Sequence, residues 1–319
     1  MGVLKESSDL AFIFPGQGSQ KVGMGRTLYE EYPEAREVFA LAQKALDFDL
    51  TAACFAGPEE YLQQTEVAQP AILTVSAAAW RVLARRGWRP RLVAGHSLGE
   101  YSALVAAEAL EITEAVRLVR LRGRLMAEAS RLEKGGMAAV LGLREEEVLA
   151  LCAEAAQEGM VQAANFNCPG QVVLSGTLTG LAAAERLARE RGARRFVALP
   201  VSGPFHSSLM RRAAEGLAAA LQDVPLRDPQ VPLVSNAGGR ILRSAEEIKA
   251  SLIGQMTSPV HWQRCVERMV EAGIRTMVEV GPGEVLAGLV RRISREVEVF
   301  PAGEAAEVRK VLDFLEGGR

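Results

Sequence analysis

The stretch Arg91-Leu-Val-Ala-Gly-His-Ser-Leu-Gly99 carries the strongest indication of the fold. Its first part, Arg91–Ala94, is a short apolar run that predicts a buried strand. Gly95 and Gly99 bracket a serine in the pattern Gly-x-Ser-x-Gly, which is typical of a sharp turn between a strand and a helix. Apolar residues then recur at helical spacing over Leu98–Leu110. A strand, a sharp turn and a helix in this order favour an α/β protein with a largely parallel sheet.

Such a turn suits nucleophilic catalysis, because it pushes the hydroxyl of Ser97 out of the sheet. The amide of the next residue, Leu98, and the N-terminus of the helix then face any oxyanion that forms at the serine. The alternative is a glycine-bracketed turn with an incidental serine. The position after a strand and before a helix favours the nucleophile.

The same alternation of short strands and helices continues on both sides of this stretch. Residues Ala11–Phe14 predict a strand that leads into a glycine-rich loop at 16–25. The spacing predicts a helix over Ala68–Arg86, with Pro70 in its first turn. After residue 230, strand and helix patterns alternate again, so the α/β pattern resumes near the end of the chain.

The middle of the chain follows a different order, βαββαβ, which is typical of a ferredoxin-like domain. Strand patterns occur at 137–143, 161–167, 171–175 and 195–200, and helical patterns at 144–157 and 177–191. We therefore expect residues 133–202 to form a ferredoxin-like domain. It would be inserted into a discontinuous α/β domain made of residues 1–132 and 203–319.

Composition and charge argue against several classes of function. The 319 residues are 49% hydrophobic and 24% charged, which is ordinary for globular proteins of one or two domains. A net charge of −2 argues against a protein that coats nucleic acid. The four cysteines lie far apart and only three histidines exist, so no metal site is expected. Neither a signal peptide nor a long apolar run is evident, and we expect a cytoplasmic protein without membrane contact.

A serine nucleophile needs a general base, and three histidines are available. His96 lies on the turn itself and points wrongly for this role, while His261 lies near an expected helix start, where a packed histidine is the plainer interpretation. His206 directly follows the expected insert, where a cleft between domains would form, and is the favoured base. The acidic residues that could complete a triad are candidates by chain order only: Glu215, Asp223 and Asp228.

The loop Gly16-Gln-Gly-Ser-Gln20 does not fit a phosphate-binding motif. Lys21 occupies the third glycine position of Gly-x-Gly-x-x-Gly, and no Gly-Lys-Ser/Thr follows. A loop of small residues at the end of the first strand can instead supply a second backbone amide to an oxyanion. The alternative is a simple turn after that strand.

Seven blocks of the chain, in this order, resemble blocks of the malonyl-CoA:acyl-carrier-protein transacylases. They are Phe14-Pro-Gly-Gln-Gly-Ser-Gln20, Thr65-Glu-Val-Ala-Gln-Pro-Ala71, Gly95-His-Ser-Leu-Gly-Glu-Tyr-Ser-Ala103, Arg122-Gly-Arg-Leu-Met126, Asn165-Phe-Asn-Cys-Pro-Gly-Gln171, Val201-Ser-Gly-Pro-Phe-His-Ser207 and Val280-Gly-Pro-Gly283. They span the chain from about residue 11 to residue 290. The resemblance implies an α/β-hydrolase-like large domain with a parallel sheet and a ferredoxin-like insert.

Carried over by motif, the resemblance implies a Ser–His dyad in which Ser97 is the nucleophile and His206 the base. It implies that Arg122 binds the malonyl carboxylate. The amides of Gln17 and Leu98 would form the oxyanion hole.

In this family a main-chain carbonyl of a glutamine orients the histidine, which implies that role for Gln255 and explains the missing acid. Arg194 and Arg195, just before the histidine block, are expected to contact coenzyme A or the carrier protein, as is Asn167. The alternative for the two arginines is a solvated strand end.

The resemblance implies S-malonyl transfer in fatty acid biosynthesis. Malonyl-CoA and an acyl carrier protein are the expected partners; no metal or redox cofactor, nucleic acid or membrane is implied, and a monomer is expected. One alternative is a hydrolase of the same fold, an esterase or thioesterase, which uses water as the acceptor. The other is a non-catalytic binding module. A polyketide carrier protein in place of the fatty-acid one would leave the sequence almost unchanged.

Overall fold

The central strand of the larger sheet is apolar at every position because both faces of the sheet are covered. This strand, β2 (Leu10–Phe14), is fully buried in the computed structural model, which describes residues 5–317. Leu10, Phe12 and Phe14 pack into one hydrophobic core, and Ala11 and Ile13 into a second core. Successive side chains of a strand point to opposite faces, so an uninterrupted apolar run marks a strand with both faces covered.

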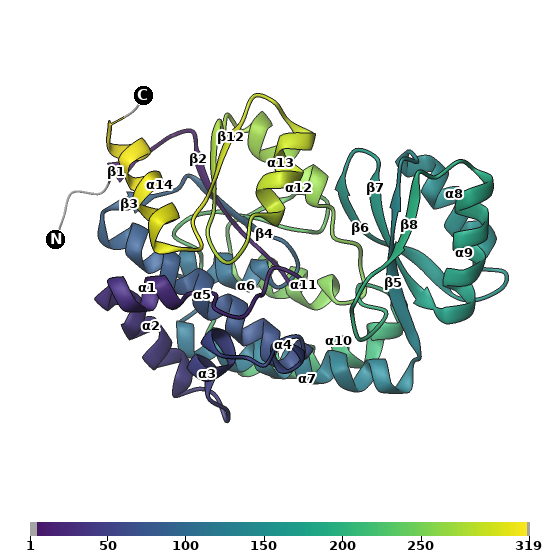
Figure 1. Ribbon diagram of the computed structural model, residues 1–319, viewed down its shortest axis with the longest axis horizontal. Coiled ribbons are helices and arrows are strands. Elements are labelled where there is room, and N and C mark those ends of the chain that lie inside the picture. Colours follow the sequence, from purple (N-terminus) through teal and green to yellow (C-terminus); the bar gives the residue numbers. More distant parts are fainter. Residues whose placement is uncertain (1–4, 318–319) are drawn as a thin grey trace.

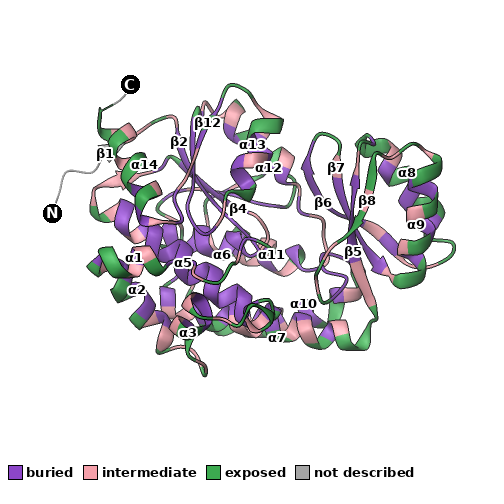
Figure 2. Ribbon diagram, in the orientation of Figure 1, coloured by how far each residue is buried: buried purple, intermediate pink, exposed green. Residues whose placement is uncertain are grey.

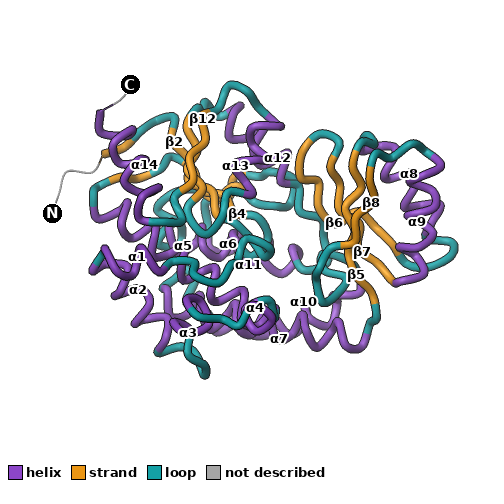
Figure 3. The backbone as a smooth tube through the Cα atoms, in the orientation of Figure 1, coloured by secondary structure: helices purple, strands orange, loops and turns teal. Residues whose placement is uncertain are grey.

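Within residues 5–317 the larger sheet has six strands in the order β10-β9-β4-β2-β11-β12 (Figures 1 and 3). The other five are β4 (Leu92–Gly95), β9 (Leu233–Val234), β10 (Ile241–Leu242), β11 (Thr276–Glu279) and β12 (Glu298–Pro301). All neighbours are parallel except β9 and β10. A separate parallel pair joins β1 (Lys5–Glu6) to β3 (Trp88–Arg89). The predicted α/β class with a largely parallel sheet is confirmed, and β10 is its antiparallel exception.

Helices cover both faces of this sheet, and Figure 2 shows that their buried sides face it. The first core includes residues of α5 (Thr65–Arg85), α6 (Gly99–Ala106), α7 (Ile112–Leu132), α10 (Arg211–Asp223) and α11 (Ala245–Gln255). The second core includes residues of α12 (Trp262–Glu271) and α13 (Val285–Ile293). The remaining helices here are α1 (Arg26–Glu31), α2 (Pro33–Gln43), α3 (Leu50–Phe55), α4 (Glu59–Leu62), a 3₁₀ turn (Ser208–Met210) and α14 (Ala305–Gly317).

Helix α5 begins at Thr65, three residues before the predicted start at Ala68. Pro70 therefore lies in the second turn, not the first, and it cannot donate a hydrogen bond to the carbonyl of Glu66. The guanidinium of Arg120, on α7, donates to that carbonyl at 2.6 Å. The neighbouring helix thus satisfies the group that the proline leaves without a donor.

Among the helices within residues 5–317, α5 alone is long and apolar enough to span a membrane. However, 89% of that stretch is buried inside the fold, and core helices meet the same criterion. Its apolar surface therefore packs against protein.

The smaller sheet is antiparallel throughout, with strand order β6-β7-β5-β8. Its elements are β5 (Gly135–Leu141), α8 (Glu145–Ala155), β6 (Val161–Cys168), β7 (Gln171–Thr177), α9 (Leu178–Glu190) and β8 (Arg195–Ala198). Both helices pack on one face of this sheet around a third core, on the side away from the larger sheet (Figure 1). The opposite face is thereby left toward the larger sheet.

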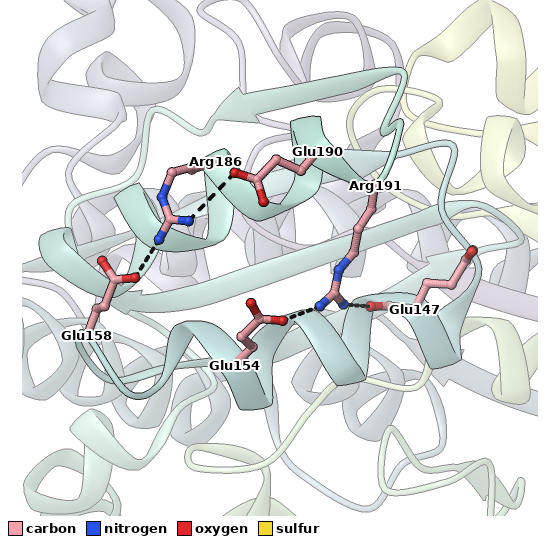
Figure 4. Close-up of polar contacts among 6 residues, drawn as sticks. All are labelled: Glu147, Glu154, Glu158, Arg186, Glu190 and Arg191. Carbon is pink, nitrogen blue, oxygen red and sulfur yellow. Dashed lines mark hydrogen bonds and ion pairs between the residues drawn. The ribbon is translucent and has the colours of Figure 1, made fainter.

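Ion pairs occur within α9 and between its C-terminal half and the α8 segment, as Figure 4 shows. Arg186 pairs with Glu158 and Glu190, and Arg191 pairs with Glu154 and donates to the carbonyl of Glu147. Exposed pairs of this kind contribute roughly 0–1 kcal/mol each. The buried third core therefore contributes more to the packing of α8 and α9 than these contacts do.

Candidate active site

Ser97 lies at the turn between β4 and α6 with a φ of 52°, in the left-handed region that non-glycine residues rarely adopt. A Cβ on Gly95 would lie 1.9 Å from the carbonyl carbon of Gly99. A Cβ on Gly99 would lie 2.1 Å from the carbonyl oxygen of Phe14. Only glycine fits these two positions, so the predicted Gly-x-Ser-x-Gly turn owes its shape to close backbone contacts.

His206 approaches this serine from the segment that follows the smaller sheet. The Ser97 hydroxyl and the Nε2 atom of His206 are 2.7 Å apart, and the Nδ1 atom of His206 is 3.0 Å from the main-chain carbonyl of Gln255. A carbonyl oxygen only accepts, so Nδ1 carries the proton and Nε2 is free to accept from the serine. Both contacts expected from the sequence are present. His206 has a φ of 56°, so both residues of the pair have a strained backbone, as often occurs at functional sites.

The environment of His206 favours its neutral form. Burial, together with the positive charge of Arg122, lowers the pKa of His206 to about 3. A neutral imidazole is the form that can accept a proton from the serine. The histidine is therefore ready to act as a base without first losing a proton.

The acidic residues proposed from chain order are not members of a triad. Glu215, Asp223 and Asp228 are exposed, and within residues 5–317 none of them contacts His206. Asp228 instead accepts from the amide of Ala245, at 2.8 Å. Chain order carries no information on which surface a helix turns toward the site, which is why these candidates were wrong.

The other two histidines have packing or bridging contacts. His261 is half-buried and stacks on Phe166, with ring centroids 4.8 Å apart. His96 bonds through Nε2 to the side-chain oxygen of Asn167, at 2.9 Å. Asn167 thus lies beside the serine turn, as part of the wall of the cleft.

Arg122 projects from the middle of α7 and is only 1% exposed. Its Nη2 donates to the Ser97 hydroxyl at 3.1 Å and to the Gln255 side-chain oxygen at 2.9 Å. Its Nη1 donates to Gln69 at 2.9 Å. Within the described part of the chain no carboxylate touches this guanidinium, and its Nε has no acceptor. A buried cation held only by neutral acceptors is a strong attractor for an incoming anion.

These side chains border a cleft of about 210 Å³ between the two sheets. The larger sheet and its helices contribute Ser97, Arg122, Leu286 and the loop 16–19, while the smaller sheet contributes Met137, Asn165, Asn167, Gln171 and Val173. Its lining is mostly apolar apart from the polar groups near the serine. Such a cleft suits a substrate with a polar reacting end and a less polar arm.

The two amides expected to bind an oxyanion also lie in this cleft. Gln17 and Leu98 both line it, and neither amide has an acceptor within residues 5–317. The Gln17 side chain is held by a hydrogen bond to Thr65, at 3.2 Å. Two unpaired amides in the cleft that contains Ser97 form a ready site for negative charge.

Arg194 and Arg195 lie outside this cleft. Both are exposed at the start of β8, and neither borders the cavity, whereas Leu199 at the other end of that strand segment does. The structure does not bring them to the serine, and their contact with coenzyme A or a carrier protein stays a prediction.

Three buried polar residues of the site were not singled out from the sequence: Gln69, Glu100 and Asn236. Gln69 and Glu100 occur in two of the quoted sequence blocks, each within an apolar helical pattern. A polar side chain at a position that such a pattern buries was the available signal. Asn236 follows the two-residue strand β9 and gave no such signal.

Comparison with known proteins identifies the class. A family model described as an acyl transferase domain matches residues 11–310. Together with the strand–turn–helix geometry around Ser97, this match makes the chain an acyltransferase.

Individual relatives narrow the class further. The malonyl CoA-acyl carrier protein transacylase of Bacillus subtilis is 43% identical over 309 residues, covering 97% of this chain and 98% of that protein. The same enzyme of Escherichia coli is 44% identical over 308 residues, covering 96% and 100%. The chain belongs to the malonyl CoA-acyl carrier protein transacylase family.

Solved structures agree with this assignment. The crystal structure of malonyl-CoA:acyl carrier protein transacylase from Xanthomonas oryzae superposes with a TM-score of 0.94 at 45% identity, over 97% of this chain and 99% of that one. A malonyl-transacylase in complex with its type II PKS acyl-carrier protein superposes with a TM-score of 0.93 at 42% identity, over 96% and 99%.

Proposed function

We propose that this acyltransferase moves a malonyl group from coenzyme A to the phosphopantetheine thiol of an acyl carrier protein, in fatty acid biosynthesis, through a malonyl-serine on Ser97. The observation that carries the proposal is the joint contact of the Ser97 hydroxyl with the His206 Nε2, at 2.7 Å, and with the Arg122 guanidinium, at 3.1 Å. The histidine can take the proton of the serine hydroxyl as it attacks. The guanidinium can bind a carboxylate carried by the acyl group that the serine receives.

Each half-reaction follows the same proton path. His206 takes the hydroxyl proton on Nε2 as the Ser97 oxygen attacks the thioester carbonyl. The tetrahedral oxyanion is bound by the amides of Gln17 and Leu98, and each such donor lowers the barrier by roughly 3 kcal/mol. The C–S bond then breaks, and the departing coenzyme A thiolate takes the proton from His206. The carrier-protein thiol reverses these steps and restores the free serine.

Gln255 acts on this path through its main chain. Its carbonyl accepts from His206 Nδ1 at 3.0 Å, which fixes the ring orientation and stabilises the imidazolium that forms during attack. A carbonyl carries only a partial charge, so the histidine ring is oriented without a carboxylate bonded to it.

The acyl-enzyme test separates this function from its alternatives. The protein is exposed briefly to an equimolar mixture of malonyl-, acetyl- and succinyl-CoA, and intact and peptide masses are recorded. We expect one malonyl group on the peptide that contains Ser97, stable in buffer and lost on addition of a carrier protein bearing phosphopantetheine. Rapid loss in buffer alone would indicate a hydrolase, and the absence of any adduct would indicate a binding module.

The low pKa of His206 predicts that the reactivity of Ser97 changes little as the pH falls from 7 to 5. A base with an ordinary pKa near 6.5 would lose roughly 30-fold in its neutral fraction at pH 5. Because burial lowers the pKa of His206 to about 3, its neutral form persists through that range. We therefore expect the rate of Ser97 labelling by an uncharged fluorophosphonate to change less than about threefold between pH 7 and pH 5. A fall of tenfold or more would contradict this environment for His206.

We also propose that residues 133–202 form a ferredoxin-like domain inserted into an α/β-hydrolase-like domain made of residues 1–132 and 203–319. The strand order β6-β7-β5-β8, with both helices on one face, supports this division. Residues 1–4 and 318–319 of the larger unit lie outside the described residues. A cytoplasmic location and a monomeric state stay predictions.

A further inference from the structure

Glu100 is a fully buried carboxylate that the reaction path above does not use. It is the second residue of α6, three positions after the serine. One carboxylate oxygen accepts from the amide of Asn236 at 2.6 Å, and the other accepts from the side-chain nitrogen of Gln255 at 2.5 Å. Burying a charged group costs free energy, so a carboxylate buried beside the site is expected to have a function there.

Both partners of Glu100 reach atoms of the site. The Gln255 side-chain nitrogen also donates to the Ser97 carbonyl at 3.0 Å, while its oxygen accepts from Arg122 at 2.9 Å. The Asn236 side chain accepts from the Ser97 amide at 2.8 Å and donates to the Gly95 carbonyl at 2.7 Å. A single intervening side chain, that of Gln255 or Asn236, therefore connects Glu100 to the serine turn, and that of Gln255 connects it to the Arg122 guanidinium.

The hydrogen-bond pattern favours the ionised form of Glu100. Both of its partners are N–H donors, and a carboxylate accepts from both without an O–H group of its own that would need an acceptor. Burial opposes this state and raises the pKa of Glu100 to about 7, although both hydrogen bonds and the charge of Arg122 favour the carboxylate. The facing titratable groups are Arg122 on α7, the Cys265 thiol on α12 and the neighbouring Tyr101.

The carboxylate, together with the Ser97 carbonyl and the Arg122 guanidinium, determines which way the Gln255 amide points. Turning that amide over would place its nitrogen against the Arg122 guanidinium, donor against donor, and its oxygen against Glu100, acceptor against acceptor. With Glu100 ionised, only the observed orientation gives the Gln255 amide a matching partner at Arg122, at Glu100 and at the Ser97 carbonyl. The oxygen that holds Arg122 is thus kept in place from the opposite end of the Gln255 side chain.

We propose that Glu100 is a positioning residue whose carboxylate fixes the Gln255 side-chain amide and thereby holds the Arg122 guanidinium where it meets the carboxylate of the acyl group. This inference rests on the proposed malonyl transfer. It concerns the choice of acyl group, since an acetyl group has no carboxylate for the guanidinium to bind.

The test is Glu100→Gln, which keeps the size of the side chain and places an N–H₂ group against one of the two donors. The matched control is Glu279→Gln. Glu279 is also fully buried, accepts two amide hydrogen bonds from Leu286 and Ala287, at 3.1 and 2.7 Å, and has a pKa raised to about 7. Its carboxylate makes no contact with the serine, the histidine or Arg122.

The measurement is kcat/KM for malonyl-CoA and for acetyl-CoA, each corrected for the fraction of enzyme that a fluorophosphonate labels at Ser97. We expect Glu100→Gln to lower the malonyl-to-acetyl ratio about tenfold, the loss expected when a charge-assisted contact is misplaced. We expect Glu279→Gln to leave the ratio unchanged. Poor folding lowers the labelled fraction and not the ratio, so a purely structural role is distinguishable.

Three outcomes would overturn the inference or its basis. An unchanged ratio in Glu100→Gln would show that Glu100 does not position Arg122. A raised ratio would show that its charge repels the substrate carboxylate more than its contacts help. A wild-type enzyme without malonyl preference would refute the proposed function instead. If Glu100→Gln does not fold, Gln255→Met, which keeps the main-chain carbonyl, is expected to lower the same ratio, and no change would overturn the inference.

Discussion

Replacing Ser97 with alanine is expected to lower malonyl transfer by about 10⁴-fold or more, because no other group can form the acyl-enzyme. The hydroxyl is the only atom in contact with both the His206 ring, at 2.7 Å, and the Arg122 guanidinium, at 3.1 Å, among the described residues. Alanine also has a Cβ, so the strain of the φ of 52° is the same in both proteins and the turn should persist. The fold should therefore be retained while the chemistry is lost.

The measurement combines steady-state transfer rates with the mass of the protein after exposure to malonyl-CoA. Ser102→Ala is the matched control, because Ser102 lies in the first turn of α6, is buried, and has no hydrogen-bond partner for its hydroxyl within residues 5–317. We expect the control to transfer malonyl at the wild-type rate. A malonyl adduct that persists in Ser97→Ala would show that the nucleophile is another residue.

Truncating Arg122 to alanine is expected to reverse the preference for malonyl over acetyl groups. The guanidinium is buried, contacts only neutral acceptors, and lies 3.1 Å from the Ser97 hydroxyl, so a malonyl group on the serine would place its carboxylate nearby. A charge-assisted hydrogen bond contributes about 1.5–3 kcal/mol, which is roughly tenfold to a hundredfold in rate. We expect malonyl kcat/KM to fall by at least that factor, with acetyl kcat/KM unchanged or improved.

Two further variants make this test specific. Arg122→Lys keeps the positive charge but loses the planar guanidinium that binds both carboxylate oxygens. Its malonyl-to-acetyl ratio should therefore lie between those of the wild type and Arg122→Ala. Arg124→Ala removes an exposed arginine on the same helix, paired with Asp47 outside the cleft, and should leave the malonyl-to-acetyl ratio unchanged. If Arg122→Ala lowers kcat/KM equally for malonyl-CoA and acetyl-CoA, Arg122 has a structural role and another residue binds the carboxylate.

Much of the site follows from local sequence patterns, because its chemistry begins at a turn. Gly95 is needed for a backbone contact within that turn and Gly99 for one with the end of β2, and the pattern of five residues that predicts Ser97 as the nucleophile is local. His206 was predicted from its place after the expected insert, and the structure brings it to 2.7 Å from the serine. The ring is oriented by the main-chain carbonyl of Gln255, as the family resemblance implied, so the acids considered from chain order have no part in the site.

The strands could be predicted for a similar reason. An apolar run such as Leu10–Phe14 has one stable environment, a sheet covered on both faces, and the alternation of strand and helix patterns then implies mainly parallel pairing. The antiparallel strand β10 has only two residues, too few to show a period. The start of α5 was misplaced because Pro70 lies in the second turn, where Arg120, 54 residues away from Glu66, donates to the carbonyl that the proline leaves without a donor.

The sequence by itself determined the class of the fold, the serine turn and the residues that meet there, because each rests on contacts between near neighbours or on motifs of fixed spacing. Only the tertiary structure decided how Arg122 is held. Gln69, Glu100 and Gln255 come from three helices far apart in the chain, and hydrogen bonds among them become specific only when packing excludes water. A buried network of this kind depends on the positions of side chains in space, and linear spacing does not encode those positions.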